Sequence, residues 1–212
     1  MSTLLSHFEL LFKDQAPVIG IEVETVLQGY FLEITNLEER DFLYSIEFVA
    51  LASNDGSANR QLDGNTIAIL DNPGAPTSDN VFGQLDLVSS VGPLNTYSPT
   101  DLSLRIASGA TALLVVIPQV IPIMGDAMAV NRDFEVRGYV QLSLPANADG
   151  SPQSNRAVQV MASPQNRAAF YTFPNASNFG GGILRNQVQT SLPTGNGGCV
   201  QTVEPSDAPL PA

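Results

Sequence analysis

Residues 134–144 read FEVRGYVQLSL, which is the most regular alternation of apolar and polar residues in the chain. Apolar residues stand at most of the even positions, among them Phe134, Val136 and Val140, and mostly polar residues stand between them. A period of two places the two sets of side chains on opposite faces of a β-strand. The stretch therefore predicts a strand with one buried face and one solvated face.

Similar stretches lie on both sides of it, at residues 18–25, 30–35, 42–49, 66–70, 81–88, 101–106, 111–117, 158–160 and 168–172. Turn-forming residues separate several of them, as in Asp71-Asn72-Pro73-Gly74. The run at 111–117 is apolar almost throughout, which predicts a central strand buried on both faces. Since about eight to ten strands suffice for two packed sheets, we expect an all-β fold, a two-sheet β-sandwich of jelly-roll or immunoglobulin-like type.

The N-terminal segment shows a different spacing. Leu4, Phe8 and Leu11 follow one another at helical intervals, with Leu5 and Phe12 beside them. This pattern predicts a short helix over residues 2–12. Because a helix of this length is marginal in water by itself, we expect it to dock on the sandwich or on a neighbouring subunit.

The C-terminal segment loses periodicity after Phe173 and is rich in Gly, Asn and Pro. Ile183, Leu184 and Val188 provide one short strand at most. The expected organisation is an N-terminal helical arm at 1–14, a β-sandwich domain at 15–173 and an irregular C-terminal arm at 174–212.

The chain is poor in residues that carry out chemistry, with one His, one Cys, one Lys and no Trp. His7 has no nucleophile motif to serve, and Cys199 follows two glycines and is expected to be a solvated thiol, with an intermolecular disulfide as the alternative. We therefore expect no enzyme, no catalytic residue, no metal site and no cofactor. Calcium, through the oxygen-rich residues 54–57 with Asp63 or through Asp149 with Asn147, is the weaker alternative.

The formal net charge is −12, and only 14% of the residues are charged. Nine scattered cations argue against binding to nucleic acid. The longest apolar run, residues 113–124, contains two prolines and is too short to span a bilayer, so no membrane insertion is expected. No signal peptide is recognisable, which leaves a cytoplasmic protein or one exported and assembled without a classical signal.

These observations favour a non-enzymatic structural subunit that self-assembles through its terminal arms into a filament, shell or surface layer. A low charge density favours contact with further copies of the same chain. The alternative is a β-sandwich binding or accessory module for carbohydrate, calcium or a partner protein. The expected assembly interface consists of apolar residues in the two arms: Leu4, Leu5, Phe8, Leu11, Phe12, Phe179, Ile183, Leu184 and Val188.

Overall fold

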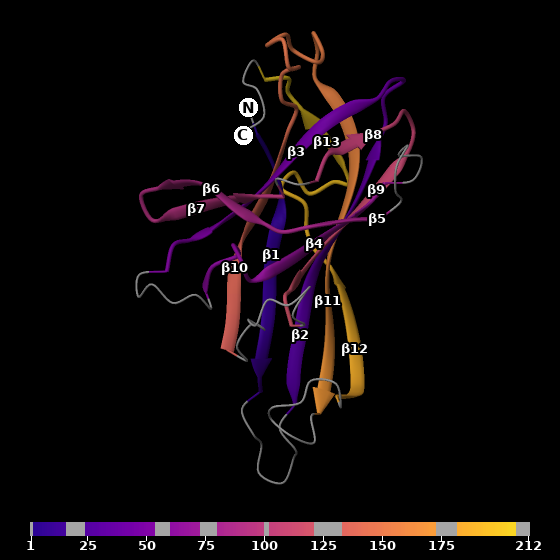
Figure 1. The fold of residues 1–212 in the computed structure, drawn as a ribbon. Helices are drawn as coiled ribbons and strands as arrows, with labels where there is room; N and C mark the ends of the chain where they lie inside the picture. The colour runs from indigo at the N-terminus through magenta and orange to yellow at the C-terminus, as the bar shows by residue number, and fades with distance from the viewer. Residues whose placement is uncertain are drawn as a thin grey trace.

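The computed structural model describes residues 2–15, 24–53, 60–72, 80–99, 102–120, 133–172 and 182–206. Over these residues the chain is all-β, and all the pairings between its strands are antiparallel (Figure 1). The all-β class expected from the alternating stretches is confirmed.

The thirteen strands are β1 (Thr3–Asp14), β2 (Thr25–Asn36), β3 (Phe42–Leu51), β4 (Thr66–Asp71), β5 (Asn80–Gly83), β6 (Asp86–Val91), β7 (Leu94–Ser98), β8 (Leu104–Ile106), β9 (Thr111–Pro118), β10 (Asp133–Ser143), β11 (Val158–Thr172), β12 (Ile183–Ser191) and β13 (Val200–Val203).

The strands form one continuous network in the order β5-β4-β9-β2-β1-β10-β3-β7-β6. Strand β11 pairs with the whole of β2 and carries β12 and β13 on its other edge, and β8 pairs with β3. The two separate sheets of a sandwich are not confirmed, because these pairings join the strands into a single curled sheet.

The sheet branches at strand β2. Along one edge it pairs with β1 over residues 25–28 and with β9 over residues 30–35. Gly29 stands between the two stretches, and a Cβ there would lie 2.5 Å from Ile117 Cγ2 and 3.0 Å from the carbonyl oxygen of Val116. A glycine is therefore required where β1 and β9 part.

The core lies where the curled sheet closes on itself. Tyr30 on β2 and Phe48 on β3 are three strands apart in the sheet, which is roughly 14 Å in a flat sheet. Their ring centroids are nevertheless 5.6 Å apart, and both side chains are fully buried. The Phe8 ring packs edge-on against both of them. Figure 1 shows β3, β4 and β9 crossing the long strands β1, β2 and β11.

The helix expected over residues 2–12 is wrong, since Thr3–Asp14 forms strand β1. It lies inside the sheet, paired with β10 over most of its length and with β2 near its end. Phe8, Leu10 and Phe12 alternate as buried residues, and an irregularity in pairing near Leu5 brings that side chain into the core as well. Pairing with β10 supplies the backbone hydrogen bonds that a short isolated helix holds only weakly.

Two further expectations need correction. The C-terminal segment is not irregular throughout, because its described part contains two strands, β12 and β13, both paired with β11. Strand β9 is central, as expected, but it is not buried on both faces. Ala112, Leu114 and Val116 are buried, whereas Val115 and Ile117 between them are only half-buried.

Candidate functional site

The expected N-terminal half of the assembly interface is mostly internal. Leu5, Phe8 and Phe12 are buried in the chain's own core, Leu11 is half-buried, and only Leu4 is exposed. Gly138 on β10 leaves room for the Phe8 ring. A Cβ added at Gly138 would lie 2.8 Å from Phe8 Cε1 and would overlap the carbonyl oxygen of Val49. These buried side chains serve folding and are not available to a partner.

The expected C-terminal half of the interface is exposed. Ile183, Leu184 and Val188 all lie on β12 and have exposed fractions of 52%, 46% and 45%. Phe179 lies outside the described residues. The structure thus brings together three of the residues expected from the sequence, and it separates them from the N-terminal group.

Strand β12 is an unusually open edge. All nine of its residues are exposed, and in the described part of the chain it pairs only with β11. It contains no Pro, Lys, Asp or Glu, the residues that commonly protect an edge strand from further pairing. The pairing with β11 is irregular at Arg185, which leaves the stretch 186–191 as a regular edge.

Next to β12, the outward side of the sheet carries a groove of about 500 Å³. Gly29, Phe31 and Ile117 line it together with Arg167 and Val188. The Arg167 guanidinium lies over the Phe31 ring, 4.3 Å from its centroid. Arg167 also donates hydrogen bonds from Nε and Nη2 to Gln165 Oε1, at 3.1 and 3.0 Å, so the cation is held in a fixed place. No sequence motif marks this group, because strand register alone brings Phe31 and Arg167 together.

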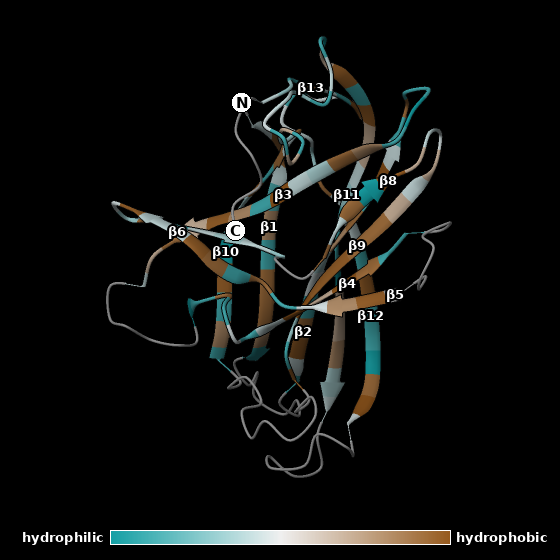
Figure 2. Ribbon diagram, turned by 45° about the horizontal axis from the view of Figure 1, so that its top comes forward, coloured by the Kyte–Doolittle hydropathy of each residue, from teal (hydrophilic) through white to brown (hydrophobic). Residues whose placement is uncertain are grey.

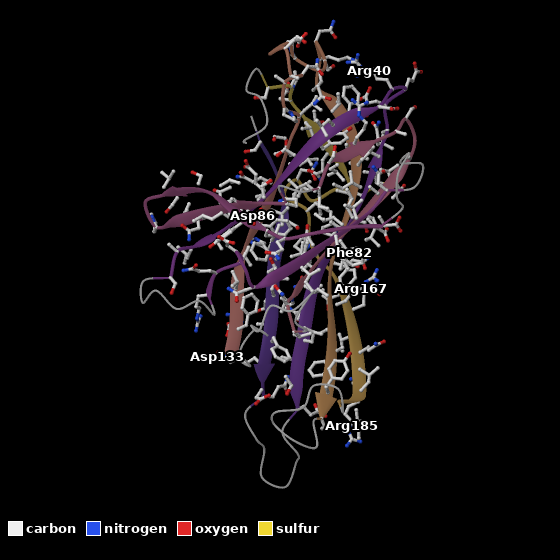
Figure 3. All side chains as sticks on the ribbon, in the orientation of Figure 1. Arg40, Phe82, Asp86, Asp133, Arg167 and Arg185 are labelled. Carbon is white, nitrogen blue, oxygen red and sulfur yellow. The ribbon has the colours of Figure 1, made fainter. Side chains whose placement is uncertain are left out.

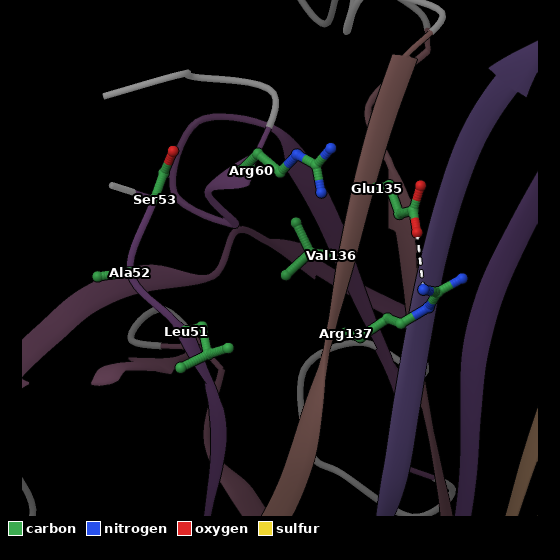
Figure 4. A pocket seen from close by; sticks show the side chains of 7 residues that line it. All are labelled: Leu51, Ala52, Ser53, Arg60, Glu135, Val136 and Arg137. Carbon is green, nitrogen blue, oxygen red and sulfur yellow. Dashed lines mark ion pairs between the residues drawn. The ribbon is translucent and has the colours of Figure 1, made fainter. Parts of the chain in front are cut away.

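A second groove, of about 380 Å³, lies beside β10 (Figure 4). Two of its lining residues form ion pairs: Glu135 lies 2.9 Å from Arg137 Nη1 and 2.8 Å from Lys13 Nζ, and Arg137 also pairs with Glu9. The hydrogen bond from Lys13 is the main reason why the pKa of Glu135 lies below its ordinary value. This network ties β1 to β10, and it gives the single lysine an ion-pair partner on the neighbouring strand.

A third groove, of about 410 Å³, lies at the turn after β2 and is lined by Glu38 and Arg156 among others. Glu38 accepts hydrogen bonds from Arg156 Nη2 at 2.5 Å and from the backbone N–H of Gln159 at 2.8 Å. The neighbouring Asn36 is fully buried and donates from Nδ2 to the carbonyl oxygens of Arg40 and Ile106. These polar groups fasten the turn to β8 and β11.

The remaining candidates for chemistry are His7, Cys199 and the possible calcium ligands. His7 and Cys199 are both exposed, and Cys199 is a free thiol. Asp149 accepts hydrogen bonds from the backbone N–H and the hydroxyl of Ser151, which lower its pKa and fit a turn. Within the described ranges, no three His, Cys, Asp or Glu side chains gather as a metal site would require. The calcium candidate at 54–57 lies outside those ranges.

Two buried tyrosines, Tyr30 and Tyr44, have raised pKa values because burial disfavours the phenolate. Each has a hydrogen-bond partner, Ser6 Oγ at 2.9 Å and Asn36 Oδ1 at 3.2 Å respectively. Both hydroxyls are thus satisfied inside the protein.

The described part of the chain has no helix long and apolar enough to cross a membrane.

No protein-family model, curated protein or solved structure matches the chain.

Proposed function

We propose that this protein is a non-enzymatic structural subunit that assembles with further copies of itself into a filament, shell or surface layer. The observation that carries the proposal is strand β12, an exposed and almost uncharged sheet edge with three exposed aliphatic side chains. Of the two terminal segments, β12 is the one available for assembly, since most apolar residues of the N-terminal segment are buried in the core.

A second copy is the partner that fits this edge. An open edge presents unpaired backbone N–H and C=O groups, which another strand satisfies by β-addition. Two β12 strands in antiparallel contact present the same chemistry to each other, and the only charge on each is Arg185. Few charges need to lose their hydration when such edges meet, which offsets the repulsion between two chains of net charge −12.

The fold suits a rigid building block. We also propose that the two branches that leave β2, one through β1 and one through β9, act as the two layers of a sandwich-like frame. Tyr30 and Phe48 support this idea, because the ring of Tyr30 on β2 meets the ring of Phe48 on the β1 branch across the core.

The test is self-association of the purified chain, followed by sedimentation velocity over a range of concentrations and by electron microscopy. We expect the double variant Leu184→Lys/Val188→Lys to shift the protein to smaller species, because lysine on an edge opposes strand pairing. Val91→Lys is the matched control, since Val91 is 73% exposed on the edge strand β6. A wild-type chain that stays monomeric at high concentration would sink the proposal.

The alternative is a binding or accessory module for carbohydrate, calcium or a partner protein. The groove of about 500 Å³ favours it, because apolar walls with one fixed cation are typical of a ligand site. A monomer that binds glycans on an array, or releases heat with calcium in titration calorimetry, would replace the assembly proposal.

A further inference from the structure

The sheet has an apolar face on its outward side. Strand register places Ile69, Val115 and Phe31 in one row across β4, β9 and β2, and Ile67 and Ile117 in the next. Phe82, which pairs with Ile69 on the adjoining β5, is 65% exposed. Directly opposite residues of antiparallel strands share a face. We call these six side chains the outer apolar face.

This face is as aliphatic as the buried face behind it. Figure 2 colours β4, β5 and much of β9 brown, and Figure 3 labels Phe82 and Arg167, which both belong to this side of the sheet. Strands that are apolar on both sides are normally covered on both sides. Contiguous apolar patches on a surface commonly mark interaction sites.

Charged residues flank the outer apolar face in a particular order. On one side, Asp71 and Glu33 lie in the same row, joined through Leu113. On the other side lies Arg167, which pairs with Gly29 on β2. Glu33 and Gly29 are each two residues from Phe31, so the acidic and basic rows are about 13 Å apart with the apolar row midway.

This arrangement is complementary to itself. Consider two copies that face each other across a two-fold axis parallel to the row of Phe31 and Val115. In this arrangement β2 of one copy lies opposite β2 of the other and runs in the opposite direction. Glu33 of one copy then stands opposite Gly29 of the other, at the groove in which Arg167 is fixed. The same contact forms twice, which is the pattern of a symmetric dimer.

We propose that a second copy of this chain packs on the outer apolar face, with Glu33 of each copy entering the groove and pairing with Arg167 of the other. The inference rests on the proposed function and names a surface that meets β12 only at the groove wall, which residues 187–189 line. About five strands and three rows cover roughly 500 Å² on each copy, so the pair buries about 1,000 Å², near the lower limit for a specific interface.

The test is a charge exchange measured by sedimentation equilibrium. We expect Glu33→Arg and Arg167→Glu each to weaken dimerisation by about tenfold or more, because each places like charges together. The double variant Glu33→Arg/Arg167→Glu should restore the dissociation constant to within about threefold of the wild type. Glu39→Arg, the same charge change in an exposed turn, should have no effect on dimerisation.

Thermal melts of all variants confirm that they fold. Glu33→Gln, at an exposed position, provides a second reading if Arg167→Glu unfolds, and it should weaken the dimer without destabilising the monomer. A wild type that never associates overturns both proposals. If association is unchanged in the Glu33 and Arg167 variants but is lost in Leu184→Lys/Val188→Lys, the outer-face dimer is wrong and the proposed function is still supported. Weakening without rescue in the double variant overturns the Glu33–Arg167 pairing.

Discussion

Gly138 on β10 allows close packing with β1 and β3, because it has no side chain in the space that Phe8 and Val49 occupy. It pairs with Phe8 on β1 and Ala50 on β3, and the Phe8 ring lies over it to reach Phe48. We expect Gly138→Ala to lower the free energy of unfolding by about 1–3 kcal/mol, because an added methyl group must displace packed atoms.

Urea unfolding followed by circular dichroism measures this change. Gly198→Ala is the matched control, since the nearest atom to a Cβ there is 3.8 Å away. It should change stability by less than about 0.5 kcal/mol. Equal stability of the two variants would contradict the packing of Phe8 over Gly138.

Glu135 links stability to pH through its pairs with Lys13 and Arg137. Its pKa in the folded chain is lower than its ordinary value of 4.5, so the ionised form favours folding. That contribution is complete above pH 4.5 and is lost as the pH falls through the lowered pKa. We expect Glu135→Gln to be less stable than the wild type at pH 7 and to approach it in acid.

Chemical unfolding at a series of pH values from neutral to acidic measures the difference between the two proteins. Glu39→Gln serves as the control in an exposed turn. A difference that stays constant across the series would mean that Glu135 acts through packing and not through its charge.

At the scale of elements, β1 is an interior strand and not an expendable arm. It separates β2 from β10 and buries Leu5, Phe8, Leu10 and Phe12. Deleting residues 1–14 should therefore abolish cooperative folding, because it removes part of the core and exposes two strand edges. The loss of a thermal unfolding transition in the truncated chain would show this. A truncated chain that melts like the full one would contradict the central position of β1.

The sequence predicted those elements whose pattern has only one interpretation. FEVRGYVQLSL alternates over most of its length, and all but its last residue lie in β10 as expected. The helix predicted for the first strand is wrong because its apolar residues fit two periods: Leu4, Phe8 and Leu11 match a helix, whereas Phe8, Leu10 and Phe12 match a strand. The partner that decides between them, β10, lies more than a hundred residues away, beyond any local pattern.

The candidate site was predicted only in part, for a related reason. Ile183, Leu184 and Val188 stood out as apolar residues in a polar segment, and their role in assembly stays a prediction. Glu33 and Arg167 did not stand out, because each is an ordinary charged residue in its own strand. Only the register of β2, β9 and β11 shows that they flank one apolar face.

For the whole molecule, the β12 edge and the outer apolar face together determine which assemblies can form. A single symmetric contact yields a closed pair of subunits, whereas two different contacts on one subunit allow growth without closure. Blocking β12 alone should leave dimers, and disrupting the outer face alone should leave pairs joined at their edges. Loss of both should leave monomers.

The pairing of Thr3 with Leu142 joins parts of the chain that are synthesised at different times. During synthesis, β1 is made before its main partner β10, which appears only after more than a hundred further residues and on the order of ten seconds at ordinary translation rates. Throughout that interval β1 lacks the strand with which it pairs over most of its length. Until β10 leaves the ribosome, the nascent chain therefore carries an apolar strand without its main partner, and such a strand is prone to aggregation.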